Sequence, residues 1–95
     1  MNECFFIGEV IEVGKFKFIL NSKIKHKSEI ILKVKLFDGN SINAIAYDEK
    51  ADYILRNDFL TSIVFIQGRL EDRPKEIQIN ILYIEKMSPR SENKR

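Results

Sequence analysis

Lysine and phenylalanine side chains alternate near the start of this chain, and together they suit the binding of a polyanion. Seven of the sixteen Lys and Arg residues lie between positions 15 and 35, where Glu29 is the only acid. This stretch carries a net charge of +6, so the other 74 residues sum to −4 in a chain of net charge +2. Such segregation indicates a polyanionic partner met on one side. The lysines are Lys15, Lys17, Lys23, Lys25, Lys27, Lys33 and Lys35.

Three aromatic rings, of Phe16, Phe18 and Phe37, lie among or beside these lysines. Nucleic acids need stacking partners for bases as well as cations for phosphates, so the mixture points to that class of ligand. Phe16 and Phe18 alternate with lysines, which favours their packing into the core. Phe37 lies beside a turn, and both base stacking and packing against a loop or a second subunit remain open for it.

Other chemistry finds little support in the residue types. One cysteine excludes an internal disulfide framework and a Cys-based zinc site. His26 has no nearby carboxylate or second ligand in the sequence, so we expect it neither to bind metal nor to catalyse. There is no nucleophile with a base, no metal-ligand cluster and no glycine-rich phosphate loop. We therefore expect no enzymatic activity, no cofactor, no metal and no small-molecule substrate.

The length and composition indicate one small domain. The chain has 95 residues, of which 44% are hydrophobic, enough to specify a core. No apolar run approaches the ~20 residues that span a bilayer, and the first three residues lack the basic start of a signal peptide. We expect a cytoplasmic protein with no membrane partner.

Period-two alternation of apolar residues predicts strands along most of the chain. The first strand continues past a bend at Gly14, and Asp38-Gly39-Asn40 is a tight-turn signal between the second and third strands. A loop containing Pro74 separates the last two strands. The predicted strands cover residues 4–18, 30–37, 41–47, 62–70 and 76–85.

Only residues 48–57 break this period. Asp48 suits a helix N-cap, and Ala51, Ile54 and Leu55 fall on one helical face, so a single short helix is predicted. Residues 88–95 are poor in apolar side chains. We expect a domain over residues 1–87 and a flexible basic tail over residues 88–95.

This order predicts an all-β fold, a five-stranded Greek-key OB-fold barrel with one short helix between strands 3 and 4. A generic α+β sheet could share the order. The glycine bend favours the barrel, since one long strand can then serve two sheets.

Several segments resemble the bacterial single-stranded DNA-binding (SSB) protein family in order and spacing. MNECFFIGEV is similar to the family's first strand, INAIAY at 42–47 to its third, and SIVFIQGRL at 62–70 to its fourth. The primosomal replication protein N-like relatives share this barrel, so a reduced relative of that kind is an alternative. The resemblance implies single-strand binding and assembly into a homodimer or homotetramer.

This chain also departs from the family pattern. Only Asp38-Gly39-Asn40 joins strands two and three, where the family has a long hairpin, and Ser41 replaces a frequent tryptophan. The tail SPRSENKR lacks the family's acidic, apolar-tipped terminus. A small binding footprint follows, and recruitment of partners through such a tail is not implied.

Strand alternation assigns the outward side chains. Lys33, Lys35 and Phe37 face outward on one strand and Asn43, Ile45 and Tyr47 on the next. Tyr47 and Phe65 match aromatic positions of the resembled family, where the first stacks on DNA and the second could lie in a subunit interface. The predicted nucleic-acid-binding residues are the seven lysines named above with Phe37, Tyr47, Phe65 and Arg69.

The leading hypothesis is therefore non-enzymatic binding of single-stranded DNA in replication, recombination or repair. Lysines would draw in the phosphate backbone, and exposed rings would stack on bases. One alternative is a protein-interaction module of a replisome or another complex, motivated by the outward apolar residues Ile31, Ile45 and Phe65. Another is an RNA-binding OB domain.

Overall fold

The residues that the structure describes form six strands and one helix. The computed structural model describes residues 3–21, 23, 25–72 and 77–87. The elements are β1 (Glu3–Val13), β2 (Lys17–Phe18), β3 (Ser28–Leu36), β4 (Ser41–Tyr47), α1 (Asp48–Arg56), β5 (Ile63–Asp72) and β6 (Ile77–Lys86). In these ranges no helix has the length and apolar character needed to cross a membrane. The predicted tail, residues 88–95, lies outside the described residues, so the division into domain and tail stays a prediction.

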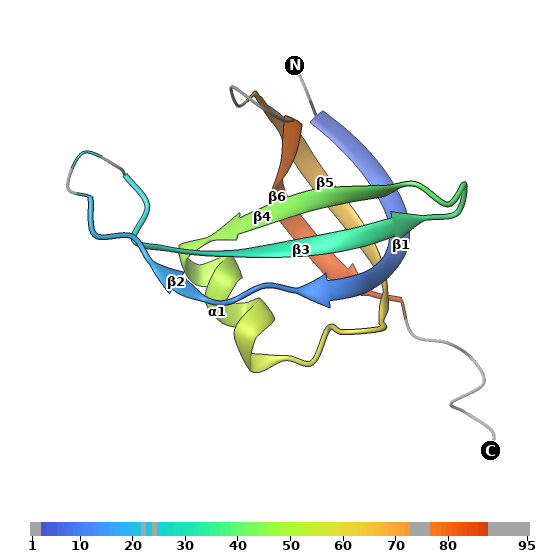
Figure 1. Cartoon of the computed structure of the whole chain (residues 1–95), viewed down its shortest axis with the longest axis horizontal. Helices are drawn as coiled ribbons and strands as arrows, with labels where there is room; N and C mark the ends of the chain where they lie inside the picture. Colours follow the sequence, from blue (N-terminus) through green and yellow to red (C-terminus); the bar gives the residue numbers. More distant parts are fainter. Residues whose placement is uncertain (1–2, 22, 24, 73–76, 88–95) are drawn as a thin grey trace.

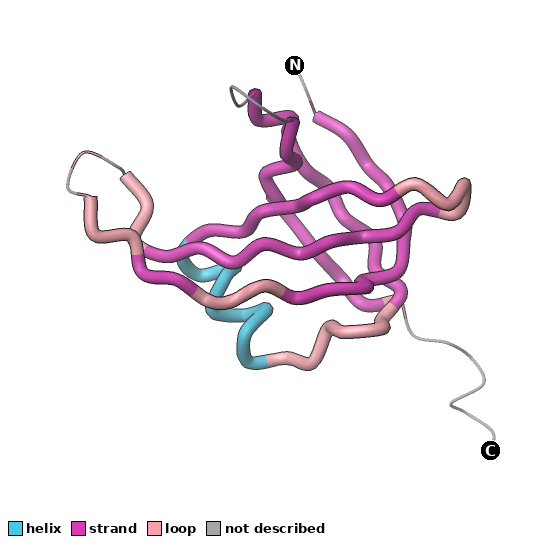
Figure 2. Tube along the Cα trace, viewed as in Figure 1, coloured by secondary structure: helices cyan, strands magenta, loops and turns pink. Residues whose placement is uncertain are grey.

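The five long strands close into a barrel (Figures 1 and 2). The strand order is β1-β5-β6-β4-β3-β2, and an additional pairing of β1 with β3 closes the circle. All pairings are antiparallel except the short parallel contact of β4 with β6. Since α1 lies between the third and fourth long strands, the predicted OB-fold barrel is confirmed.

The first strand differs from its prediction in one respect. It was expected to run through Gly14 to Phe18, but β1 ends at Val13 and β2 is a separate piece that pairs with β3. The register of β1 against β3 also shifts between Val10 and Glu12, which marks a bulge. The bend thus begins before Gly14, whose N–H still donates to the Ile31 carbonyl at 2.7 Å.

The core follows the alternation, and α1 contributes to it. Ala51 and Ile54 of the helix are buried, whereas Leu55, predicted on the same face, is 53% exposed. Phe59, just after the helix, is the largest fully buried side chain. The strands contribute Val10, Ile30, Leu32, Val34, Ala44, Ala46, Val64, Ile66, Ile79, Ile81 and Ile84.

Two residues of the strands are also placed differently from their prediction. Phe18, expected in the core, is 75% exposed because β2 lies beyond the barrel and, among the described strands, pairs with β3 only. Ile45, expected outward and exposed, is 1% exposed because β4 has neighbours on both sides there, Ile31 on β3 and Asn80 on β6. Ile45 is therefore not available to a partner surface.

Gly8 permits a close approach of two backbones in the barrel. A Cβ at this position would lie 2.6 Å from the carbonyl oxygen of Lys35 on β3. That backbone cannot move without opening the ladder between β1 and β3. Glycine is therefore required where the barrel closes.

Candidate nucleic-acid interface

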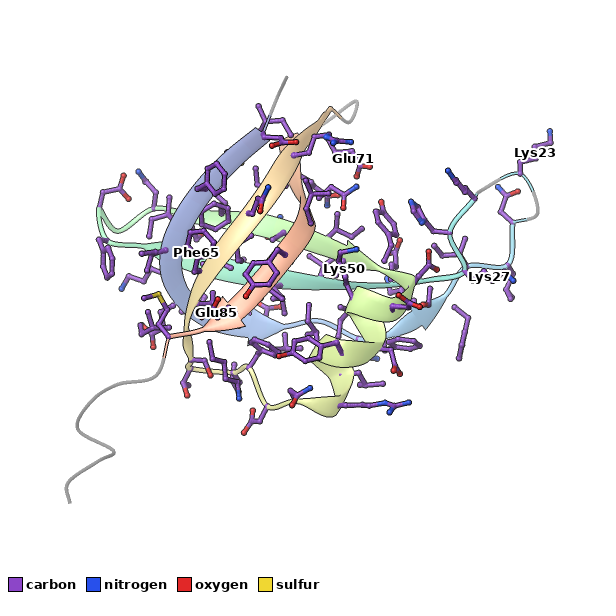
Figure 3. All side chains as sticks on the ribbon, turned by 180° about the vertical axis from the view of Figure 1, so that it is seen from behind. Lys23, Lys27, Lys50, Phe65, Glu71 and Glu85 are labelled. Carbon is purple, nitrogen blue, oxygen red and sulfur yellow. The ribbon has the colours of Figure 1, made fainter. Side chains whose placement is uncertain are left out.

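The eleven predicted site residues occupy three parts of the molecule. Five lysines lie in residues 15–28, which we call the basic arm, and Figure 1 shows the loop from β2 to β3 projecting from the barrel. Lys33, Lys35, Phe37 and Tyr47 belong to β3, its turn and the end of β4. Phe65 and Arg69 lie on β5; Figure 3, turned by 180°, shows Phe65 on the other side of the barrel and Lys23 and Lys27 on the arm.

Acids oppose the lysines of the strands. Lys35 pairs in register with Glu9, and Lys33 pairs with Glu12, whose Oε1 lies 4.0 Å from Lys33 Nζ. Lys17 likewise faces Glu29 across β2 and β3. These pairs are solvent-exposed and contribute little to stability. They do reduce the positive potential that the barrel face offers to a phosphate.

The loop lysines of the basic arm lie outside the strands, so no strand pairing among the described residues sets an acid opposite them as Glu29 is set opposite Lys17. Residues 15–28 contain five lysines and no Asp or Glu. Lys23, Lys25 and Lys27 are exposed, as are the apolar side chains of Phe18 and Leu20, the latter at 92%. The arm therefore combines cations with an exposed ring, the combination that the sequence had suggested for the whole basic stretch.

Tyr47 is not an isolated ring. The imidazole of His26 stacks on it with the ring centroids 4.0 Å apart and an interplanar angle of 11°. The Tyr47 hydroxyl donates to Glu71 Oε1 at 3.2 Å. One face of the predicted stacking residue is thus covered by a histidine from the arm, which sequence reasoning had set aside.

Asp48 binds the end of the arm that leads into β3. Its carboxylate accepts the backbone N–H of Lys27 at 2.7 Å and of Ser28 at 3.3 Å, and His26 Nδ1 lies 2.8 Å from its second oxygen. The predicted N-cap role is wrong, because the cap residue of α1 is Tyr47 and no side-chain hydrogen bond from the described residues caps the helix. The backbone of Asp48 has φ 55°, a left-handed conformation that Asp adopts more readily than most residues. Its carboxylate contacts the arm from this position.

These hydrogen bonds make Asp48 a source of acid sensitivity. The Lys27 N–H and then His26 lower the pKa of its carboxyl below the ordinary value of 3.8. A lowered folded-state pKa contributes stability that is present above the ordinary value and lost as pH falls through the folded one. The stability difference between wild type and Asp48→Asn should therefore be largest near neutral pH and shrink below about pH 4.

Urea unfolding at a series of pH values checks this expectation. The matched variant Asp38→Asn changes an acid whose hydrogen bonds, to Asn40, stay within its own turn. Equal stability differences for Asp48→Asn at neutral and acid pH would contradict the role of its carboxylate charge.

Phe37 and Tyr47 mark opposite ends of the β3–β4 face. Phe37 lies in the turn and is 81% exposed, so it is free to stack. Tyr47 pairs with Glu29 at the far end of β4, whereas Ser41 pairs with Lys35 near the turn. Six steps along a strand separate residues 41 and 47, which amounts to ~20 Å. A ligand that touches both rings must therefore run along the strands.

Phe65 belongs to an aromatic face on the outside of β1, β5 and β6, formed by Phe5, Phe65 and Tyr83. The Phe65 ring stacks on Phe5 with centroids 6.0 Å apart, and meets Tyr83 edge-on at 6.4 Å. Phe5 is 62% exposed. Arg69, also on β5, lies 3.6 Å from Glu3. These residues form a surface separate from the basic arm.

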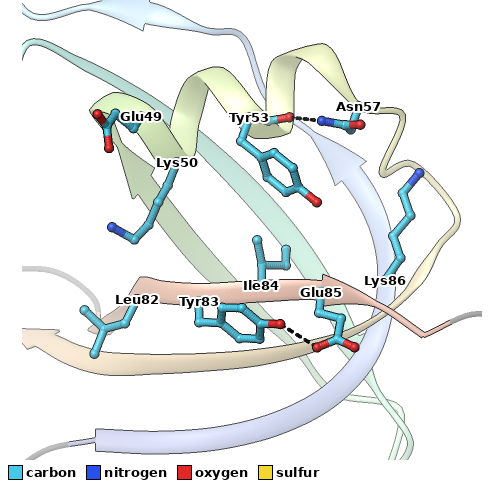
Figure 4. Close-up of a pocket in the computed structure, with 9 residues that line it drawn as sticks. All are labelled: Glu49, Lys50, Tyr53, Asn57, Leu82, Tyr83, Ile84, Glu85 and Lys86. Atoms are coloured by element: carbon cyan, nitrogen blue, oxygen red, sulfur yellow. Dashed lines mark hydrogen bonds between the residues drawn. The ribbon is translucent and has the colours of Figure 1, made fainter.

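A pocket lies between α1 and the end of β6 (Figure 4). Tyr53 and Tyr83 line it, and the Tyr83 hydroxyl donates to Glu85 Oε1 at 2.6 Å, which raises the pKa of that tyrosine. A raised pKa keeps Tyr83 neutral, so it is a poor base. Across residues 3–21, 23, 25–72 and 77–87, no three His, Cys, Asp or Glu side chains group as metal ligands.

Comparisons with known proteins show which solved structures share this fold. No family model and no curated protein matches this sequence. The structure is similar to an SSB domain from Synechococcus, with TM-score 0.75 and 14% identity over 90% of this chain and 94% of that one. It is also similar to a small single-stranded DNA-binding protein from Streptomyces coelicolor, with TM-score 0.68 and 16% identity over 90% of each chain.

A third similar structure is the PriB protein of Ralstonia solanacearum, with TM-score 0.73 and 12% identity over 93% of this chain and 99% of that one. The similar structures include both kinds of protein that the sequence segments resemble, SSB proteins and primosomal proteins. At 12 to 16% identity such likeness establishes architecture. The chain is therefore an OB-fold protein whose structural neighbours are SSB domains and PriB.

Proposed function

We propose that this protein binds single-stranded DNA without catalysing a reaction, in replication, recombination or repair. The observation that carries the proposal is the basic arm, with five lysines, no acid and an exposed aromatic ring on a projecting hairpin. The likeness of the barrel to proteins named as single-stranded DNA-binding supports it. In OB folds the strand 2–3 face and the flanking loops bind oligonucleotides, and the arm is such a loop.

The proposed mechanism divides the work among residues. Lys23, Lys25 and Lys27 neutralise phosphates and release counterions, while Lys33 and Lys35 contribute less because acids oppose them. Exposed rings at Phe18 and Phe37 stack on unpaired bases. Duplex DNA hides its base faces, so single strands are preferred.

Fluorescence anisotropy with a labelled dT oligonucleotide tests this function across a salt series. We expect tighter binding than to a duplex of equal length, with a log-log salt slope of about −0.7 per phosphate contact. Affinity for the duplex as high as for dT, or affinity that salt does not change, would refute the proposal. Higher affinity for the matching RNA strand would favour the RNA-binding alternative.

The aromatic face supports a second proposal, that two copies of the chain associate there. Phe5 and Tyr83 are 62% and 48% exposed and flank Phe65, so association would remove apolar area from water. Light scattering after size-exclusion chromatography tests this. A monomer of 11.2 kDa at all concentrations would contradict it. The surface lies apart from the arm, so dimerisation and DNA binding are compatible.

A further inference from the structure

His26 and Tyr47 form a two-ring stack where the basic arm meets the barrel. Their centroids are 4.0 Å apart and their planes deviate by 11°, so Tyr47 has one face covered by the imidazole. A base approaching from the arm side would meet His26 before it met Tyr47. The imidazole, and not the tyrosine behind it, is therefore in position to contact such a base.

The imidazole is held in place from its edge. Asp48 Oδ2 lies 2.8 Å from His26 Nδ1, and the same carboxylate binds the backbone N–H groups of Lys27 and Ser28. A carboxylate only accepts hydrogen bonds, so Nδ1 carries the proton and donates. Both the ring and the backbone that follows it are fixed before a ligand arrives, which lowers the entropic cost of binding.

The surroundings of the ring suit a nucleotide. The His26 side chain is 37% exposed although Tyr47 covers one of its faces, so part of the imidazole stays accessible to a ligand. Lys25 precedes His26 and Lys27 follows it, and both lysines are exposed. A base on the imidazole would therefore have phosphates on either side within reach of a lysine.

From these observations we infer that His26, stacked on Tyr47 and tethered by Asp48, forms a subsite for one unpaired nucleobase at the root of the basic arm. The inference rests on the proposed single-strand binding and assigns a base contact to a residue for which residue type and spacing alone predict no such role. Histidine is among the side chains on which unstacked bases stack. Tyr47 then acts as the support of the platform.

Three substitutions separate the ring from the tether, each measured by anisotropy with a dT oligonucleotide. His26→Ala removes both and should weaken binding about 5-fold to 150-fold, the range for loss of one stacked base. His26→Gln keeps a side chain that can hydrogen-bond to Asp48 but has no ring, and should be as weak as His26→Ala. His26→Phe keeps a ring without the tether and should retain most of the affinity.

A direct readout comes from NMR, because His26 is the single histidine of the chain. Its ring proton resonances should move upfield as the oligonucleotide is added, owing to the ring current of the stacked base. Tyr53→Phe, which removes a tyrosine hydroxyl on α1 outside the basic arm and keeps the ring, serves as the control and should bind like wild type.

The possible failures are distinguishable. If wild type does not bind dT at all, the proposed function is refuted and this inference with it. If wild type binds but His26→Ala binds equally well, only the subsite is refuted. If His26→Gln binds like wild type, or the histidine resonances do not move on binding, His26 serves as a tether and the stacking role is refuted.

Discussion

Reversing three charges of the basic arm, with Lys23→Glu, Lys25→Glu and Lys27→Glu together, is expected to weaken binding of a dT oligonucleotide on the order of 100-fold or more at about 50 mM salt. Each phosphate contact on a single strand contributes about 0.7 to the log-log salt slope, so three lost contacts lower it by about 2. The introduced carboxylates also repel the backbone. Anisotropy titrations at several salt concentrations measure both effects.

The matched control reverses three charges elsewhere: Lys50→Glu, Arg56→Glu and Lys86→Glu. These residues lie on α1 and β6, and the net charge changes by the same amount. If binding depended on net charge alone, both triple variants would lose the same affinity. That result would remove the arm from the proposed site, whereas a loss confined to the arm variant supports it. Circular dichroism shows whether each variant keeps the barrel.

Replacing Phe59 by Ala is expected to lower the free energy of unfolding by about 3 to 5 kcal/mol. Phe59 is the largest fully buried side chain, 1% exposed, in the segment between α1 and β5. Its ring meets Tyr53 edge-on with centroids 5.8 Å apart, and Lys86 Nζ lies 5.1 Å from its centroid. Alanine would leave a cavity where helix and barrel meet, in a domain whose whole stability is roughly 5 to 15 kcal/mol.

Phe37→Ala makes the same chemical change at a site that is 81% exposed, and should alter stability by no more than about 0.5 kcal/mol. Urea unfolding followed by circular dichroism compares the two variants. Similar losses at both positions, or a Phe59→Ala variant as stable as wild type, would contradict the contribution of the buried Phe59 ring to the stability of the core.

Local patterns were sufficient to predict the barrel. Alternation placed Leu32 and Val34 inward and Lys33 outward, because a strand with one buried face must repeat every two residues. The turn at Asp38-Gly39-Asn40 and the helix after Tyr47 are likewise signalled by adjacent residues. Each of these features depends on side chains close in sequence, so one sequence is enough to find them.

The features that were missed depend on register between distant segments. Neither Glu9 opposite Lys35 nor Asp48 beside His26 can be read from neighbours, since the partners lie 26 and 22 positions apart. Phe18 was assigned to the core because its spacing continued that of β1, but the chain leaves the barrel after Gly14. The proposed site therefore lies mainly on the arm, whereas the sequence predicted it mainly on the strand face.

The closure of the barrel has a consequence for biosynthesis. Phe6 of β1 pairs with Ile66 of β5, 60 positions later in the chain. At the ~5 to 20 residues per second of translation, the first strand waits roughly 3 to 12 s for this partner. The β3–β4 hairpin, with a four-residue connection, can form at once. During that interval Phe5, Phe6 and Ile7, which pair with β5, have no partner strand, so this part of β1 can associate with other nascent chains or with chaperones.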